Sequence, residues 1–453
     1  MPDDLETSEY PRMLVVAIGR INAADTVNNG LLLRNLFGQW PRENLAQIYS
    51  SGDNGDEGFC GRYYRLSPVD RRFGKLFYRL KAEAQKEAAE ANPAVAASAG
   101  GSTRRFAFVR NWATRWLIDG GGYELLFRPR LSSSMLDWVK GFEPHIVFAQ
   151  GYNLAFTWLP LLLAERLGLP LAYYPTDDWP QNRYRADAVG LPPIARFARQ
   201  AVLRASGQLV ERATVRLAFN PYMCAEYLRR YQKEFALLMH GDEFGRFEAI
   251  PPTRLAKPDE CWIVATGDFD RHRLPLLEDL DAACEILHRK GFKIRATVFP
   301  ARRLVESNSH GSGLRHVRFE ACPSHAGLAS VLRGADILFL PERFDETVKT
   351  ICLSVSSKAH LFMFSGRPIV VYSDGRAGVA RYAWEEGWGA LVDHRGADHL
   401  AGALERIITD NSERLRLAAA ARRVAEANHN LPRIQSAFRD ALCTAVHQAG
   451  AAP

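Results

Sequence analysis

Short apolar runs alternate with segments of helical spacing through the first half of the chain. The run at 13–18 predicts a buried strand, and a small polar loop leads from it into a predicted helix at 31–37. The same order recurs, with strands predicted at 146–149, 171–174 and 217–220 and helices ending near Gly168 and covering 223–231. Such alternation is typical of a parallel sheet covered by helices on both faces.

The second half restarts this pattern. Its predicted strands are 262–266, 293–299, 317–320, 337–340 and 369–372, and its predicted helices are 276–289, 326–333 and 357–364. The segment 240–258 between the halves contains Gly241, Gly245 and the pair Pro251-Pro252, which suits a linker. We therefore expect an α/β protein with two doubly wound, Rossmann-like domains, at 1–245 and 246–430, followed by a helical segment at 431–453.

Composition narrows the class of protein. A chain of 453 residues with 47% apolar residues is long enough for two or three domains with substantial cores. The N-terminus lacks a basic region followed by an apolar run, and no stretch of about 18 apolar residues is present, so we expect neither a signal peptide nor a spanning helix. Seven scattered cysteines indicate a reduced cytosolic protein without a disulfide framework or zinc site. The Ala-, Glu- and Ser-rich stretch 83–103 predicts a mobile surface insertion.

The net charge of +7 fits nucleic acid, an anionic membrane or anionic substrates, and by itself selects none of them. No nucleic-acid-binding module is recognisable, so we expect no nucleic-acid partner. No Gly-x-Gly-x-x-Gly follows the first strand, which argues against a dinucleotide oxidoreductase.

The most informative segment is 356–372. Ser357 and Lys358 open an apolar helix, Gly366 closes it, and Pro368 precedes the buried run that begins at Ile369. A helix N-terminus that carries a lysine and hydroxyl groups suits an anion, above all a diphosphate.

This segment resembles the Ser-Lys-Leu-x-Glu-Tyr-x-Ala-x-Gly-x-Pro-Val-Ile motif of GT-B glycosyltransferases, especially the bacterial polysaccharide and lipid-linked glycan group, as a family 4-like or Ser-Lys variant. Three other segments, 317–320, 335–341 and 389–392 with the following 398–408, are similar to that group in order and spacing. The resemblance implies two domains that face each other across a cleft, with a nucleotide-sugar donor on the second. It also implies a C-terminal helix that packs back on the first domain.

One departure from the family pattern concerns its two glutamates, which lie eight positions apart in retaining members. The corresponding positions here are Leu353 and Leu361. The anomeric outcome therefore stays open, and Lys358 is left as the main charged group of the donor helix.

The resemblance also implies which residues bind the donor. Gly267 follows the first strand of the second domain, and either Arg273 or Arg271 faces the phosphates, where an arginine can donate two bonds at once. Glu342 lies in the loop where the donor sugar should project. In the first domain, Gly19 and the turn that contains Asn29 and Gly30 precede the first helix and allow close backbone approach. A solvated loop and a plain βα turn are the alternatives.

Three carboxylates are candidates for a catalytic base that deprotonates an acceptor hydroxyl. Asp25 follows the first strand, and Asp177 and Asp178 follow another buried strand, so all three lie at strand carboxyl ends, where doubly wound folds bind ligands. The neighbouring Trp179 is expected to stack on a sugar ring. Helix capping and a solvated turn are the alternatives. His240, His325 and His360 are interpreted as packed side chains.

Basic and apolar residues alternate at helical spacing in 71–80 and 194–216. This pattern fits either docking on an anionic membrane surface or core-facing helices with solvated arginines. The first interpretation agrees with a cytoplasmic enzyme, peripheral at the inner face of the membrane, that transfers sugar to a lipid-linked or polysaccharide acceptor. We expect no cofactor and no metal, because basic residues and helix amides can serve the diphosphate. A sugar-nucleotide epimerase and an inactive binding scaffold of the same fold stay open.

Overall fold

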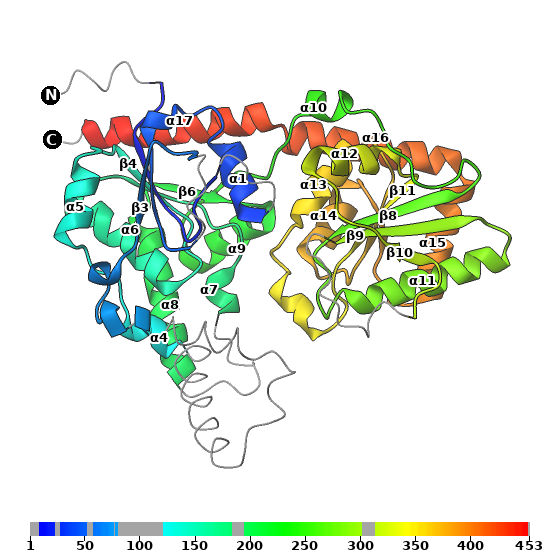
Figure 1. The fold of residues 1–453 in the computed structure, drawn as a ribbon, viewed down its shortest axis with the longest axis horizontal. Helices are drawn as coiled ribbons and strands as arrows, with labels where there is room; N and C mark the ends of the chain where they lie inside the picture. The colour runs from blue at the N-terminus through cyan, green and yellow to red at the C-terminus, as the bar shows by residue number, and fades with distance from the viewer. Residues whose placement is uncertain are drawn as a thin grey trace, which may run out of the picture. The chain divides into compact units, whose positions relative to one another are not determined.

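A computed structural model describes residues 9–22, 28–51, 58–76, 78–79, 121–183, 194–300 and 313–451. The predicted insertion at 83–103 lies outside these residues. The chain divides into two compact units (Figure 1), which are described separately. Unit 1 comprises Met1–Leu238 with Ala437–Pro453, and unit 2 comprises Met239–Ser436.

Unit 1 contains a parallel sheet in the order β3-β2-β1-β4-β5-β6-β7. Its strands are β1 Met13–Val16, β2 Leu45–Tyr49, β3 Arg62–Arg65, β4 Ile146–Ala149, β5 Leu171–Tyr173, β6 Val215–Ala218 and β7 Ala236–Leu237. All four residues of β1 are fully buried, and successive strand residues point to opposite faces, so both faces of the central sheet are covered.

Some helices of unit 1 begin at a residue whose side chain caps the first turn. The helices of this unit are α1 Asn28–Leu36, α4 Gly122–Leu126, α5 Ser133–Lys140, α6 Leu154–Leu167, α7 Trp179–Asn182, α8 Ile194–Arg212 and α9 Pro221–Tyr231, with short 3-10 turns at Arg42–Asn44 and Pro68–Asp70. Asn153 caps the start of α6, and Gly168 ends it in the left-handed conformation, with φ of +67°. This glycine stop is the one predicted from the sequence.

The last helix, α17 (Leu431–Gly450), begins in unit 2 and ends in unit 1. Its Phe438 is fully buried and packs among Phe37, Trp40 and Phe148, with ring centroids 5.6–5.8 Å apart. Aromatic contacts of this kind stabilise the packing beyond the area that they bury. The C-terminal part of the chain therefore completes the core of unit 1.

Unit 2 repeats the architecture with the strand order β10-β9-β8-β11-β12-β13, again parallel throughout. The strands are β8 Cys261–Gly267, β9 Ile294–Pro300, β10 Val317–Phe319, β11 Ile337–Pro341, β12 Ile369–Tyr372 and β13 Ala390–Val392. The helices are α10 Phe244–Glu248, α11 Leu274–Arg289, α12 His325–Gly334, α13 Ser357–Phe364, α14 Gly378–Glu386, α15 Ala397–Thr409 and α16 Asn411–Asn428, with a 3-10 turn at Glu346–Thr350.

Helices α11 and α15 pack against each other and fill one core of unit 2 with the alternate residues Ile337 and Phe339 of β11. Helix α13 contacts α16 and β11. Its end follows the predicted signal, because Gly366 adopts a φ of +68° and Pro368 precedes β12. The predicted α/β class with two doubly wound, Rossmann-like domains is confirmed. Among the described residues, no helix is long and apolar enough to span a bilayer.

Candidate functional site

The strand order of unit 2 reverses between β8 and β11. From β8 the chain continues to β9 and β10 on one side, and from β11 it continues to β12 and β13 on the other. In open α/β sheets, ligands bind at this switch point, outside the carboxyl ends of the strands. Four candidate residues meet here: Gly267 ends β8, Arg273 precedes α11, Glu342 follows β11, and Lys358 lies in the first turn of α13.

A buried carboxylate joins two of these cations. Arg273 donates from Nη2 and Nε to Oε2 of Glu342, at 2.6 and 3.1 Å, and Lys358 Nζ lies 3.5 Å from Oε1. The Glu342 side chain is only 3% exposed. Burial alone would raise the pKa of Glu342, but Lys358 and Arg273 lower it overall, so the carboxylate is ionised.

Lys358 packs against Gly267. This glycine has a φ of +122°, and a Cβ built on it would lie 2.6 Å from Cδ of Lys358. Only glycine provides both the conformation and the space. Burial lowers the pKa of Lys358, although Glu342 opposes that shift.

Two helix N-termini reach the same place. The start of α11 offers no free amide, because Leu274 and Leu276 donate to the carbonyls of Asp270 and Arg273 and Pro275 has no N–H. Helix α13, however, has no side-chain hydrogen bond that caps its first turn. By contrast, Asp410 caps α16 and Ser324 caps α12. Uncapped amide groups at a helix N-terminus attract anions, and here they lie beside an arginine and a lysine. Ser357, the first residue of α13, is exposed in this turn.

The sequence left open whether Arg271 or Arg273 faces the phosphates, and the structure gives the two arginines different partners. Arg273 joins Glu342, whereas the exposed Arg271 donates from Nε to Nε2 of His272 at 3.1 Å. His272 in turn lies 2.6 Å from Asp345. The geometry therefore groups Arg273, and not Arg271, with Lys358.

The first domain places its candidates around another switch point, between β1 and β4. Gly19 lies beyond the end of β1, where the buried side chain of Gln47 accepts from the amide of Ile21 at 2.9 Å and donates to the carbonyl of Gly19 at 2.7 Å. Sequence reasoning missed Gln47. Its signal is a polar residue within a short apolar run, Leu45–Tyr49.

The expected turn at Asn29 and Gly30 is wrong. Helix α1 starts at Asn28, so these residues form its first turn instead of preceding it. Asparagine is common where helices begin, because its side chain can satisfy free amide groups. The side chain of Asn29 lies outside the described part of the chain.

The three candidate bases have different positions. Asp178 is buried and binds Arg230 through both oxygens, at 2.8 and 2.9 Å, and it also accepts from Tyr227. This arrangement is a structural ion pair and argues against a role as base. Asp177 is half-buried after β5, near Tyr152, whose pKa is raised by burial and by this carboxylate. Asp25 lies outside the described residues.

The sequence suggested that Trp179 stacks on a sugar ring, but the structure buries this side chain. Its side chain is 5% exposed and packs with Leu154 and the inner face of α8. A Cβ on Gly151 would lie 2.8 Å from its indole nitrogen. Trp179 is therefore a core residue.

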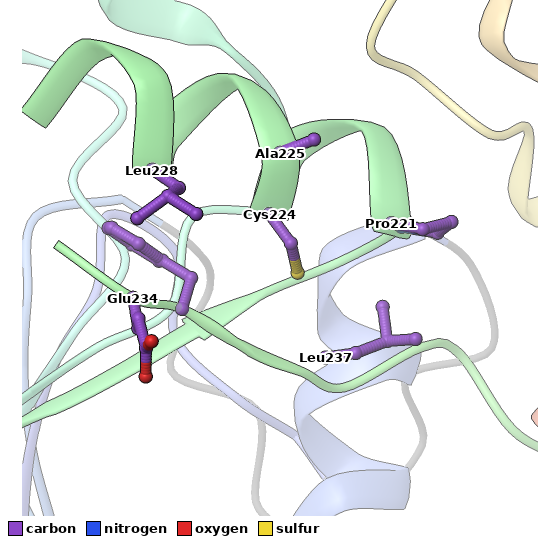
Figure 2. Close-up of a pocket in the computed structure, with 7 residues that line it drawn as sticks. Pro221, Cys224, Ala225, Leu228, Glu234 and Leu237 are labelled. Atoms are coloured by element: carbon purple, nitrogen blue, oxygen red, sulfur yellow. The ribbon is translucent and has the colours of Figure 1, made fainter. Parts of the chain in front are cut away.

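A groove of about 500 Å³ on unit 1 lies at the β7 edge of its sheet, away from the β1/β4 switch point. Figure 2 shows it between α9 and the edge of the sheet near β7, lined by Pro221, Cys224, Ala225, Leu228, Glu234, Phe235 and Leu237. This lining is apolar apart from one glutamate, and it offers no group for chemistry on an anionic substrate. No cluster of three or more metal-type side chains occurs in the part of the chain that the structure describes.

Comparisons with known proteins identify the fold. No protein-family model and no curated sequence matches the chain. The sucrose-phosphate synthase of Thermosynechococcus elongatus matches with a TM-score of 0.60 and 16% identity, over 94% of this chain and 96% of the synthase. HepE of Anabaena in complex with UDP-glucose matches with a TM-score of 0.59 and 12% identity, over 96% of this chain and 100% of HepE.

WaaG, a glycosyltransferase involved in lipopolysaccharide biosynthesis, matches with a TM-score of 0.56 and 14% identity, over 94% of this chain and 98% of WaaG. The fold is GT-B. The sequence resemblance to GT-B proteins is thus confirmed at the level of fold, across nearly the whole chain.

Proposed function

We propose that the protein is a glycosyltransferase that uses a nucleotide-sugar donor. The observation that carries this proposal is the cluster of Arg273, Glu342 and Lys358 at the β8/β11 switch point, beside the uncapped N-terminus of α13. Cations and amide groups in this arrangement suit the diphosphate of such a donor. The structurally similar HepE was solved with UDP-glucose, which supports this assignment.

The proposed chemistry needs little more than position and charge. The diphosphate accumulates negative charge as the sugar leaves, and Arg273 and Lys358 stabilise that charge. We assign Asp177 as the base that takes the proton of the acceptor hydroxyl, with Asp25 as the alternative. These residues supply the needed groups without a divalent metal or a cofactor.

For the acceptor, we propose a lipid-linked or polysaccharide glycan of the bacterial surface, reached by a cytoplasmic enzyme at the inner face of the membrane. Support comes from unit 1, where Phe73, Leu76 and Phe197 are each more than half exposed. Basic residues accompany them, and the guanidinium of Arg72 lies 5.1 Å from the Phe73 ring centroid. Apolar side chains among cations favour an anionic bilayer surface. Co-sedimentation with anionic but not neutral vesicles is the expected result, and no binding to either contradicts this part of the proposal.

The experiment that tests the function is a turnover assay with a panel of nucleotide sugars and a bacterial lipid extract. We expect release of the nucleoside diphosphate and transfer of the sugar to the extract from at least one donor. A folded protein that turns over no donor contradicts the proposal.

An epimerase is the second candidate. A putative UDP-N-acetylglucosamine 2-epimerase from Listeria monocytogenes matches with a TM-score of 0.50 and 12% identity, over 94% of each chain. Conversion of a nucleotide sugar into its epimer without transfer identifies this activity in the same assay. Donor binding without any turnover identifies a scaffold.

A further inference from the structure

Glu342 lies where the donor is proposed to bind, yet its oxygens face protein cations. Oε2 accepts two bonds from Arg273, and Oε1 faces Lys358. A carboxylate that is 3% exposed is costly to bury unless it is paired in this way. Glu342 therefore has a role that its expected contact with the donor sugar does not explain.

Glu342 occupies the edge of Arg273 that would best bind a phosphate. Arginine grips a phosphate or carboxylate best through two nitrogens of its planar fork. In Arg273, both Nε and Nη2 are directed to one oxygen of Glu342, and Nη1 lies 3.4 Å from the carbonyl of Asp268. A phosphate that uses the Nε–Nη2 edge must therefore displace Glu342.

Glu342 also lies beside Lys358, where it would compete with a phosphate for the ammonium group. The Lys358 side chain is 16% exposed, and its Nζ lies within ion-pair distance of Glu342. Contact with Gly267 limits its other positions, because the lysine stem packs against that backbone. Glu342 thus contacts both cations at the place where two phosphates are proposed to bind, and Asp270 adds only a longer contact to Nη1 of Arg273, at 3.8 Å.

We propose that Glu342 is an internal counter-ion: it holds Arg273 and Lys358 in the ligand-free protein and releases them to the diphosphate of the donor. This inference rests on the proposed function. Glu342 then competes with the diphosphate for both cations and weakens its binding. The same pairs form again as the nucleoside diphosphate leaves, which favours release of the product.

The test compares the wild-type protein with Glu342→Gln in calorimetric titrations with UDP, GDP and inorganic pyrophosphate. Removing a competing charge at this distance is expected to tighten diphosphate binding by about fivefold or more. The melting temperature of the ligand-free variant should fall, because two partly buried cations lose their counter-ion. Glu405→Gln is the matched control, since Glu405 pairs with Lys290 at 2.6 Å, away from the switch point. It should leave the affinity unchanged.

If Glu342 instead contacts the donor or only supports the fold, Glu342→Gln binds the diphosphates more weakly or equally, and the inference is overturned. If the wild-type protein binds none of the three ligands, the proposed function itself fails. Glu342→Asp covers the case in which the glutamine variant does not fold. It keeps the charge but shortens the reach to both cations, so it should also bind UDP or GDP more tightly than the wild type does; weaker binding contradicts the inference.

Discussion

Lys358 is the residue on which the proposed donor binding should depend most. Its side chain is half-buried and burial lowers its pKa, so the position is unfavourable for a lysine without a function. Its position in the first turn of α13 adds its charge to that of the helix N-terminus.

We expect Lys358→Ala to weaken nucleoside diphosphate binding about tenfold to a hundredfold, because a charge-assisted contact is lost. The fold should be retained, since Arg273 still pairs with Glu342. Isothermal titration calorimetry measures the effect, with Lys290→Ala as the exposed control. Equal affinity in both variants removes Lys358 from the site.

Asp177 and Asp178 are adjacent in the sequence, yet substitution of each should have a different consequence. Asp177→Asn should lower kcat by about 100- to 10,000-fold while leaving stability unchanged, because a proton acceptor is lost. Asp178→Asn should instead destabilise the protein by about 3 kcal/mol, since it breaks the buried pair with Arg230. Steady-state kinetics and urea unfolding separate these effects. Full activity of Asp177→Asn leaves Asp25 as the candidate base.

At the residue scale, the sequence predicted residue types better than their partners. Lys358, Arg273 and Gly267 were named from a motif and its spacing, and the fold brings all three to one switch point. The pairing of Arg273 with Glu342 spans 69 positions in the chain, so no local pattern could reveal it. The burial of Trp179 depends in the same way on packing against α8.

At the element scale, Gly267 is the contact between the end of β8 and Lys358 in the first turn of α13. We expect Gly267→Ala to weaken diphosphate binding, because its Cβ would displace the stem of Lys358, and to cost about 1–3 kcal/mol of stability from backbone strain. Gly291→Ala is a matched control, since Gly291 also has a positive φ, of +90°, but has no atom within 4 Å of an added Cβ. If both variants lose stability and neither loses affinity, Gly267 does not position Lys358.

Three histidines stack at α13: His360 and His429 are buried, and His240 is half-buried. His360 of α13 stacks on His240 and His429, with ring centroids 5.2 and 5.9 Å apart, and Tyr382 bonds to His429. Burial lowers the pKa of His240 to about 3 and that of His429 to about 4. The stacking of the two rings agrees with the interpretation of His240 and His360 as packed side chains. The side chain of His325 lies outside the described residues.

This stack predicts acid sensitivity. Both pKa values lie below the ordinary value of 6.5, so the unfolded chain binds protons that the folded protein excludes. The stabilising contribution is complete above pH 6.5 and is lost as the pH falls toward 4, with a slope approaching about 1.4 kcal/mol per pH unit for each histidine. Urea unfolding at several pH values should give a shallower slope for His429→Gln than for the wild type or for the exposed control His394→Gln. Parallel curves contradict the prediction.

The elements most visible in the sequence were those with strong end signals. Helix α13 and strands β4 and β12 lie at their predicted positions, because glycine and proline residues mark their ends. Strand β2 was missed, since Gln47 interrupts its apolar pattern, and only the folded loop after β1 explains that glutamine. The first turn of α1 was assigned to a loop because its Asn-Asn-Gly sequence also suits a turn.

For the whole molecule, two sheets with the same winding provide two switch points in one chain. The cations Arg273 and Lys358 lie at the switch point of unit 2, and the candidate base Asp177 follows β5 of unit 1, near Tyr152 beyond the end of β4. Fold alone does not fix the sugar or the acceptor. The central claim is therefore that unit 2 binds a nucleotide diphosphate.

The most direct measurement is thermal unfolding, supported by ligand-observed NMR, with a panel of nucleotide sugars and NAD as a control. We expect one donor to stabilise the wild-type protein, by about 2.7 kcal/mol at 100 times its Kd. The double variant Arg273→Ala/Lys358→Ala should gain little or nothing from the same donor. Stabilisation that is equal in the wild type and the double variant, or no response of the folded wild type to any nucleotide sugar, contradicts this claim.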